Sequence, residues 1–361
     1  MEKLKILKEL VNIRSFDTNQ NKEIIDYLEL QFKPSSQEII KVKNKCDGRE
    51  SLLVGINTKL KNISDAVVLS GHIDTVVANE KAYKTNPYVA TIIDEKMYGL
   101  GIIDMKAYFA CILNNIKELK KLDKPVVVAI SGDEETRLEG VINLTQKMKE
   151  LNIVPEFTIV GEPTSNKVCT ASKSCYEYQV DIFGKSCHSS APKNGINANY
   201  VAARIMLFVE KLCSKIKNTT LSCNVVSGGE KVNIISAKAS LVFDVRSSLK
   251  SEKDKAISKL KKFIVKLEKK YGAQIVLTQN LSIPALEKRN SSKIESLIRV
   301  FNLEEDNFVG GCEAGYYQAL GGDAIVFGVG DLTLAHKPNE YLVIDEFERY
   351  SKQFLKILKA I

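Results

Sequence analysis

The segment AVVLSGHIDTV (residues 66–76) places a short apolar run directly before a histidine and an aspartate. An apolar run of about four to eight residues, bounded by glycine and polar residues, is typical of a buried strand. The arrangement returns in PVVVAISGDEET (residues 125–136), where three acids follow the run, and further runs lie at residues 157–160 and 324–329. The fold therefore depends on several buried strands, each followed by polar residues.

Helical periodicity separates these strands. After Asp104 the apolar side chains recur at helical spacing, and they do so again over residues 141–151. Strands that alternate with helices indicate an α/β fold with a mostly parallel sheet flanked by helices. Ligands bind at the carboxyl ends of the strands in such sheets, so we expect the residues that follow the strands to form a site.

Residues 173–280 follow a different pattern. The segments at residues 176–183 (YEYQVDIF) and 239–245 (ASLVFDV) alternate apolar and polar residues, and helical stretches lie at residues 198–216 and 253–271. This pattern predicts an inserted α+β domain. We therefore divide the 361 residues into a catalytic domain over 1–172 and 281–361 and an inserted domain over 173–280.

Composition narrows the class of protein. No apolar run approaches the ~20 residues of a membrane helix, and the eight cysteines form no CxxC pair, as expected of free thiols in the cytoplasm. The net charge of +8 is concentrated in residues 250–270, which hold nine lysines against three acids. We interpret this segment as a solvated helix face. Nucleic-acid binding is the alternative, which the absence of arginine there weakens.

Candidate ligands for a cation follow several of the strands. His72 stands two residues before Asp74, which could orient its ring. Asp104 precedes a helix that it could also cap. The other candidates are Glu134, Glu135, Glu162 and His336. Two imidazoles with several carboxylates, and without thiolates, suit two divalent ions of zinc, cobalt or manganese.

These motifs occur together in one known family. SGHIDTV, YGLGIIDMK, SGDEET, VGEPTS and AHKPNEY occur in its order and at comparable spacing. Over nearly its whole length the chain resembles the acetylornithine deacetylase / succinyl-diaminopimelate desuccinylase / aminoacylase family of zinc metallohydrolases, and it is most similar to acetylornithine deacetylase. The resemblance implies a zinc-exopeptidase-like catalytic domain with an inserted lid and dimerisation domain, and hence a homodimer. It implies hydrolysis of an N-acyl amino acid, with N-acetyl-L-ornithine in arginine biosynthesis as the expected substrate.

The resemblance also assigns roles to individual residues. One metal would be held by His72 and Glu162, a second by Glu135 and His336, and Asp104 would bridge the two. Glu134 matches the general base, and Asp74 matches the acid that orients the first histidine. In the inserted domain, His188 matches a histidine that stabilises the oxyanion. Two departures stand out, because Cys187 and Ala107 replace usual glycines, and Cys187 would be strained if its backbone needed a positive φ.

The sequence gives weaker evidence about which substrate is bound than about the metal site. Arg246 and Asn233 match substrate-binding residues of the inserted domain, and the Arg246 fork suits a carboxylate. Glu313 could meet the side-chain ammonium of ornithine, or it could be an exposed loop acid. Succinyl-diaminopimelate desuccinylase, a general aminoacylase and a dipeptidase remain alternative activities, and a basic nucleic-acid-binding protein is the alternative outside enzymes.

Overall fold

The computed structural model describes residues 2–361 and separates into two compact units. Unit 1 runs to Ala171 and resumes over Lys288–Phe308 and Cys312–Ile361, whereas unit 2 comprises Ser172–Glu287 and Val309–Gly311. Unit 2 is therefore an insertion in unit 1. The division falls one residue from the expected boundary at 172/173 and seven residues from the expected boundary at 280/281.

Unit 1 is built on a sheet that has eight strands within the described residues, in the order β1-β2-β6-β3-β7-β14-β8-β13. The strands at its centre, β6, β3, β7 and β14, are parallel neighbours. Every residue of β6 is buried, as expected for a strand that is covered on both faces. The strands are β1 Glu38–Lys43, β2 Glu50–Gly55, β3 Ile63–His72, β6 Val126–Ser131, β7 Ile153–Val160, β8 Val168–Ser172, β13 Glu305–Phe308 and β14 Asp323–Val326.

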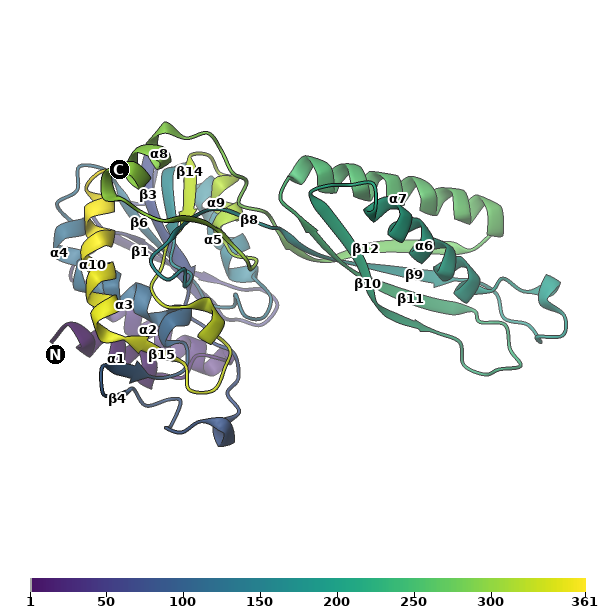
Figure 1. Cartoon of the computed structure of the whole chain (residues 1–361), viewed down its shortest axis with the longest axis horizontal. Coiled ribbons are helices and arrows are strands. Elements are labelled where there is room, and N and C mark those ends of the chain that lie inside the picture. The colour runs from purple at the N-terminus through teal and green to yellow at the C-terminus, as the bar shows by residue number, and fades with distance from the viewer. Residues whose placement is uncertain (1) are drawn as a thin grey trace. The chain divides into compact units, whose positions relative to one another are not determined.

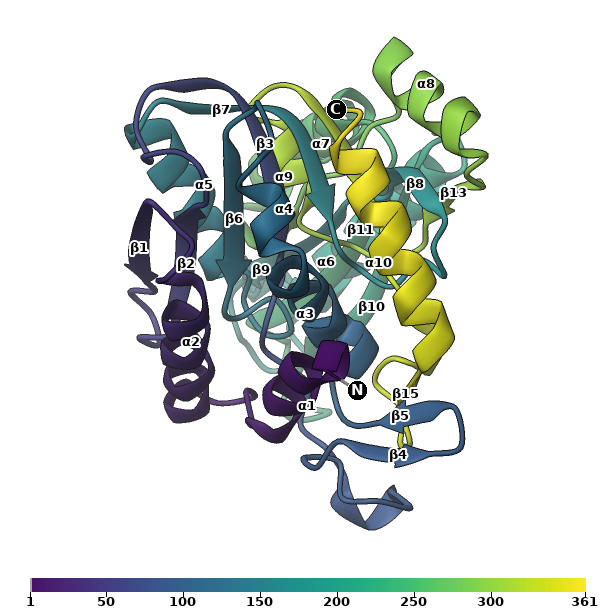
Figure 2. The same cartoon turned by 90° about the vertical axis from the view of Figure 1, so that its left-hand side faces the viewer.

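Helices cover both faces of this sheet (Figures 1 and 2). One face packs against α1 Lys5–Asn12, α2 Thr18–Phe32, α3 Ala107–Asn114 and α10 Ile344–Leu358, which share one apolar core with β3 and β6. The other face packs against α5 Glu139–Glu150 and α9 Ala314–Gln318. The short α4 Ile116–Leu119 and α8 Ser292–Phe301 complete the helices of this unit. The predicted fold class, a mostly parallel sheet between helices, is confirmed.

A small sheet joins two distant segments of unit 1. Its strands are β4 Thr91–Ile93, β5 Lys96–Tyr98 and β15 Tyr341–Val343, in the order β15-β5-β4. Tyr341 pairs with Tyr98, so the AHKPNEY segment lies beside the YGLGIIDMK segment. This pairing brings His336 and Asp104 into one region although 232 residues separate them in the chain.

Unit 2 contains an antiparallel sheet in the order β10-β11-β9-β12, with α6 and α7 packed on one face. Its elements are β9 Cys175–Phe183, α6 Ala198–Cys213, β10 Thr219–Gly228, β11 Lys238–Ser247, α7 Lys250–Tyr271 and β12 Gln274–Ile283. The predicted strands and helices of this region are all present. Burial alternates along β11, so one face of the sheet meets the helices.

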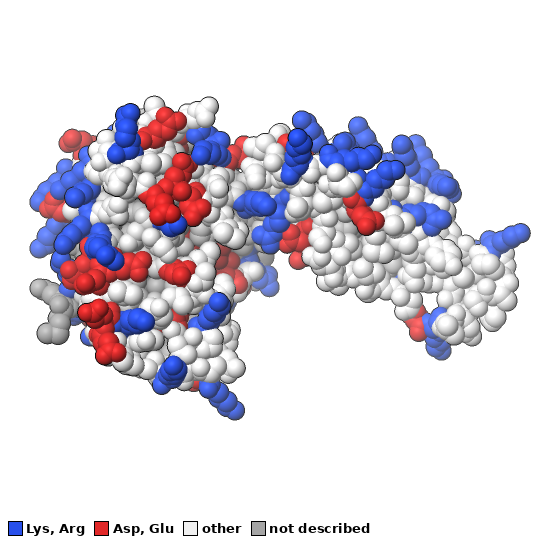
Figure 3. Space-filling view, viewed as in Figure 1, with Lys and Arg blue, Asp and Glu red and all other residues white. Residues whose placement is uncertain are grey.

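The lysine-rich segment forms α7. Lys253 is buried, with its Nζ 4.3 Å from the Tyr176 ring centre, and the other eight lysines of the helix are exposed. Basic side chains gather over α7 (Figure 3). The apolar side chains Ile257, Leu260 and Ile264 face the core of the unit. Among the residues that the structure describes, no helix is both long and apolar enough to cross a membrane.

Candidate metal centre

Three parallel neighbours in unit 1 end at the same edge of the sheet. His72 is the last residue of β3, Glu134 and Glu135 follow the end of β6, and Glu162 stands two residues after β7. Because β3 lies between β6 and β7, the three polar segments meet. The sheet thus places these residues together without any contribution from unit 2.

Asp104 reaches the same place from an irregular turn, with non-helical backbone angles, rather than from a regular helix. Gly101 adopts φ +70°, a π-turn follows over Ile102–Lys106, and α3 begins only at Ala107. Glu340 holds this turn, because its carboxylate accepts hydrogen bonds from the backbone N–H groups of Gly101 and Ile103, both at 2.9 Å. Asp104 is therefore not the N-cap that the sequence pattern allowed, and its carboxylate faces the site.

The two oxygens of Asp104 are divided between two histidines. Its Oδ1 lies 3.0 Å from His72 Nε2, and its Oδ2 lies 3.1 Å from His336 Nε2. Glu135 Oε1 lies 2.7 Å from the same His336 nitrogen, and Glu162 Oε2 lies 3.9 Å from His72 Nε2. Two ligand groups result, His72–Asp104–Glu162 and Asp104–Glu135–His336, and the donor atoms within each group lie within 4.8 Å of one another.

The oxygen and nitrogen atoms of this cluster would be better satisfied by a bound cation than by their contacts with one another. Glu162 Oε1 is buried and has no hydrogen-bond partner among the described residues. Burial raises the pKa of Glu162 well above its usual value, and the negative charges of Asp104 and Glu134 add to this effect while His72 opposes it. A bound divalent cation would give this oxygen a partner and neutralise the crowded carboxylates. Imidazole and carboxylate donors are those that zinc, cobalt and manganese accept.

The crowded carboxylates also raise the pKa values of the two histidines. Burial opposes a positive charge on His72, but hydrogen bonds to Asp104 and Asp74 outweigh burial and raise the pKa of the ring. At His336, hydrogen bonds to Asp104 and Glu135 raise the pKa to about 10. The carboxylates thus attract positive charge to both ring nitrogens that face Asp104.

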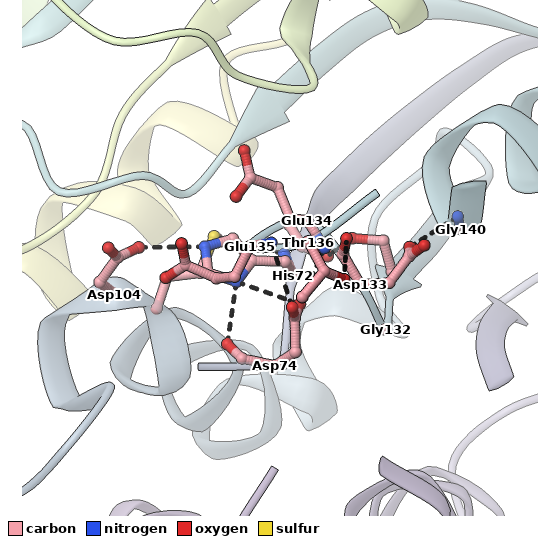
Figure 4. Close-up of polar contacts among 12 residues, drawn as sticks. His72, Asp74, Asp104, Gly132, Asp133, Glu134, Glu135, Thr136 and Gly140 are labelled. Carbon is pink, nitrogen blue, oxygen red and sulfur yellow. Dashed lines mark hydrogen bonds and ion pairs between the residues drawn. The ribbon is translucent and has the colours of Figure 1, made fainter. Parts of the chain in front are cut away.

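Asp74 connects His72 to the segment of the two glutamates (Figure 4). The Nδ1 atom of His72 lies 3.1 Å from the backbone oxygen of Asp74 and 3.5 Å from its Oδ1. The carboxylate also accepts hydrogen bonds from the backbone N–H groups of Glu134, at 3.0 Å, and Glu135, at 3.1 Å. A partner on Nδ1 leaves Nε2 as the donor atom for a metal.

Glu134 and Asp133 have opposite orientations and different tasks. The Glu134 side chain points away from Asp74, and burial raises the pKa of its carboxyl well above the usual value (Figure 4). A carboxyl group with a raised pKa beside a candidate metal centre is suited to general acid–base work. Asp133 turns the other way and accepts from the backbone N–H groups of Gly140 and Glu139, at 2.7 and 2.9 Å, so it fixes the loop to the start of α5.

Glu313 lies in an environment that the sequence did not indicate. Its side chain has no exposed surface, and its oxygens accept hydrogen bonds from the hydroxyl groups of Ser131 and of Ser70, the latter at 3.0 Å. Burial raises the pKa of Glu313 to about 7, although the serine hydrogen bonds oppose this shift. It is neither an exposed loop acid nor, in this structure, open to a substrate ammonium.

The remaining expected site residues belong to unit 2. His188 forms a bridge with Ile234, the Ser189 N–H donates to the Asn233 oxygen at 3.0 Å, and His188 and Asn233 therefore lie on adjacent segments. The guanidinium of Arg246 bonds Asp244, with Nε and Nη2 each 2.9 Å from a carboxylate oxygen.

The two departures from the motif cost the backbone nothing. Cys187 is not among the non-glycine residues with positive φ, and its thiol donates to the Ala191 oxygen at 3.4 Å. Ala107 has helical angles, with φ −61°.

Comparison with known proteins agrees with this geometry. Residues 68–360 match the model of peptidase family M20/M25/M40, and the chain belongs to this family. It is 28% identical over 360 residues to an acetylornithine deacetylase of Buchnera aphidicola subsp. Acyrthosiphon pisum (strain Tuc7), covering 94% of this chain and 92% of the relative. It is 30% identical over 376 residues to an uncharacterized metallohydrolase of Methanocaldococcus jannaschii, covering 100% and 99%. The resemblance identified from the motifs is thus confirmed, and the protein is a metallohydrolase.

Solved structures share the fold. A tripeptidase from Staphylococcus aureus superposes with a TM-score of 0.76 at 21% identity, and the aminopeptidase PepT from Bacillus cereus with 0.77 at 19% identity, each covering 99% of this chain and 97% of the other. A Bacillus subtilis protein described as a dinuclear metal binding peptidase of family M20 gives 0.70 at 15% identity, covering 99% and 96%. At these identities the likeness concerns the fold.

Glu340 and the serine partners of Glu313 were not expected from the sequence. Glu340 was visible as the acid of AHKPNEY, and its position one residue before a strand was the available signal. For Ser70 and Ser131 the signal was a polar residue at the end of an otherwise apolar strand. Neither signal alone indicates which distant group the side chain meets.

Proposed function

We propose that this enzyme hydrolyses the amide bond of an N-acyl amino acid, with N-acetyl-L-ornithine as the substrate. The two ligand groups that share Asp104, with Glu134 beside them, support the reaction class. The relatives named acetylornithine deacetylase, at 28–32% identity, support the substrate. Arginine biosynthesis and a cytoplasmic location stay predictions that go with this substrate.

We infer that the site holds two divalent ions, with zinc as the first choice and cobalt or manganese as alternatives. His72 and Glu162 would hold one ion, Glu135 and His336 the other, and Asp104 would touch both. The unpartnered Glu162 oxygen and the division of Asp104 between two histidines support this assignment. The Bacillus subtilis relative described as a dinuclear metal binding protein supports the count of two.

The catalytic steps assigned to this chain are movements of protons. The bound cations would lower the pKa of a water molecule and polarise the substrate carbonyl group. Glu134 accepts the proton of the attacking water and then donates it to the nitrogen of the leaving amine. A raised pKa helps the second half of this exchange, because the protonated carboxyl must persist until the amine departs.

Unit 2 would supply the contacts beyond the metals. We assign His188 to the oxyanion, with Asn233 beside it on the adjacent segment as a substrate contact. Arg246 would bind the substrate carboxylate, for which it must exchange or share its present partner Asp244.

We also propose a homodimer through unit 2. β10 is an edge strand of the antiparallel sheet, and it exposes Val225 and Val226, which are 57% and 55% exposed. An exposed edge strand with apolar side chains is suited to pairing with a second chain. Val226→Lys should then shift the protein from dimer to monomer in sedimentation, whereas an unchanged dimer would place the interface elsewhere.

A side-by-side rate assay tests the activity. The protein, stripped of metal and reloaded with Zn²⁺ or Co²⁺, is offered N-acetyl-L-ornithine, N-succinyl-diaminopimelate, N-acetyl-L-methionine and a dipeptide. Metal-dependent turnover with kcat/KM highest for acetylornithine supports the proposal. A preference for another of the four keeps the reaction class and replaces the substrate, and no turnover of any of them overturns the proposed activity.

A further inference from the structure

A buried carboxylate lies behind the metal ligands without being one of them. Glu313 immediately precedes α9, on the sheet face that also carries α5. One of its oxygens accepts from the Ser131 hydroxyl, and the other accepts from the Ser70 hydroxyl at 3.0 Å. Sequence separations of 182 and 243 residues make both contacts products of the complete fold.

The strand register shows what this carboxylate joins. Ser70 and His72 stand two residues apart on β3, so their side chains project from the same face. Ser131, the last residue of β6, pairs with His72 across the parallel ladder and shares that face. Glu313 therefore spans the two strands where one ends in a metal ligand and the other leads into Glu134 and Glu135.

We propose that Glu313 is a positioning residue of the metal centre, which clamps β3 to β6 through Ser70 and Ser131 and so sets the separation between His72 and the glutamate pair. The proposal rests on the metallohydrolase class of the site and not on the identity of the substrate. The clamp is buried, so both ends of the linkage lie where water cannot compete for the hydrogen bonds.

The charge of Glu313 adds a second contribution. Burial favours the neutral acid and the two donated hydrogen bonds oppose it. When Glu313 is ionised, its negative charge lies in a buried position and acts on nearby cations with little screening. Groups behind the direct ligands typically alter metal affinity or activity by about 10–100-fold when they are removed. Glu313 therefore serves the metals, whereas the sequence had suggested a contact with the substrate.

Variants of Glu313 and of its two serine partners separate the effect of the hydrogen bonds between the strands from the effect of the negative charge. Glu313→Gln keeps the shape and one acceptor oxygen but removes the charge, and Glu313→Ala removes both. The double variant Ser70→Ala/Ser131→Ala leaves the carboxylate and removes its donors. We would measure Zn²⁺ affinity by competition with a chromogenic chelator, and kcat and KM for N-acetyl-L-ornithine and N-acetyl-L-methionine.

The expected result is a loss of Zn²⁺ affinity of about 10–100-fold in Glu313→Ala, with a smaller loss in Glu313→Gln and in the double serine variant. At limiting metal, kcat for N-acetyl-L-ornithine and kcat for N-acetyl-L-methionine should fall by equal factors. The ratio of the two KM values should stay constant. The matched control is Phe354→Leu, which alters a fully buried side chain of α10 in the opposite layer. It should lower the unfolding temperature and leave Zn²⁺ affinity unchanged.

Wild-type Zn²⁺ affinity in both Glu313 variants and in the double serine variant would overturn the proposal. A KM increase confined to acetylornithine, with unchanged Zn²⁺ affinity, would overturn it in favour of a substrate contact. If the Glu313 variants do not fold, the single variant Ser70→Ala decides by the same titration. The Zn²⁺ titration needs no substrate, so it remains decisive even where the proposed acetylornithine activity fails.

Discussion

The Nδ1 atom of His72 lies 3.1 Å from the backbone oxygen of Asp74, and the carboxylate of Asp74 turns to the backbone of the glutamate pair. One short segment of chain thus orients a candidate metal ligand and holds the candidate base. The hydrogen bond on Nδ1 leaves Nε2, which faces Asp104 and Glu162, as the atom that would give up its proton and bind a metal.

Asp74→Asn should lower kcat by at least about tenfold, because its amide can accept from only one of the two N–H groups and lacks the negative charge beside His72. Kinetics at saturating Zn²⁺ would measure this loss. Asp26→Asn, which alters a surface acid paired with Lys22 and Lys41, is the control and should retain activity. Equal activity in the two variants would contradict the role of Asp74.

Glu134→Gln and Glu135→Gln form a matched pair of neighbouring substitutions. Glu134→Gln should bind two Zn²⁺ equivalents as wild type does and lose about 10²–10⁴-fold in kcat, because only the proton acceptor is removed. Glu135→Gln should weaken the binding of one of the two equivalents, because Glu135 belongs to the His336 group. Metal analysis after dialysis, combined with kcat, checks both. If Glu134→Gln lost a metal, Glu134 would be a ligand rather than the base.

Gly101→Ala should impair metal binding as well as stability. Gly101 has φ +70°, and an added Cβ would lie 2.4 Å from Thr75 Cγ2, so the turn that carries Asp104 must shift. Gly48→Ala is the control, since Gly48 has φ +76° and its Cβ would meet only Lys43 Cε, at 3.4 Å. Both should lose about 1–2 kcal/mol through the left-handed backbone. Only Gly101→Ala should also weaken Zn²⁺ binding in the chelator titration, and equal Zn²⁺ affinity in the two variants would refute this.

The pH dependence of stability in the metal-free protein should reveal Glu313. Burial raises its pKa from 4.5 to about 7, so between these pH values the unfolded chain releases a proton that the folded chain keeps. The stabilisation is complete below pH 4.5 and is lost as the pH rises through 7. Glu313→Gln does not titrate, so its unfolding temperature should rise relative to wild type between pH 5 and pH 8, by the equivalent of roughly 3 kcal/mol. Parallel curves for the two proteins would show that Glu313 titrates normally.

The fold, and the grouping of the candidate metal ligands at one edge of the sheet, could be predicted because their signals are local. An apolar run followed by SGHID or SGDEE indicates both a buried strand and the polar residues at its end, and parallel strands bring such ends together. His72, Glu135 and Glu162 could therefore be placed at one edge from short stretches of sequence.

Other features depend on contacts between distant segments. A short motif such as GCEAG looks the same whether its acid is exposed or buried, and the partners of Glu313 lie 182 and 243 residues away. Asp104 preceded a helical pattern and so suggested a cap, but the π-turn after Gly101 delays the helix to Ala107. That turn is stabilised by Glu340, which the local pattern around Asp104 does not contain.

The insertion of unit 2 within unit 1 has a consequence for biosynthesis. His72, Asp104 and Glu162 all precede unit 2 in the chain, whereas β14 and His336 follow it. During translation, the residues of the His72–Asp104–Glu162 group therefore emerge from the ribosome long before His336, which completes the second ligand group. Zinc could meet the first group on a nascent chain, but the paired centre can form only after unit 2 has been translated and β14 has docked beside β7. Hydrolytic activity that needs both ligand groups is thus withheld until His336 has been translated and placed.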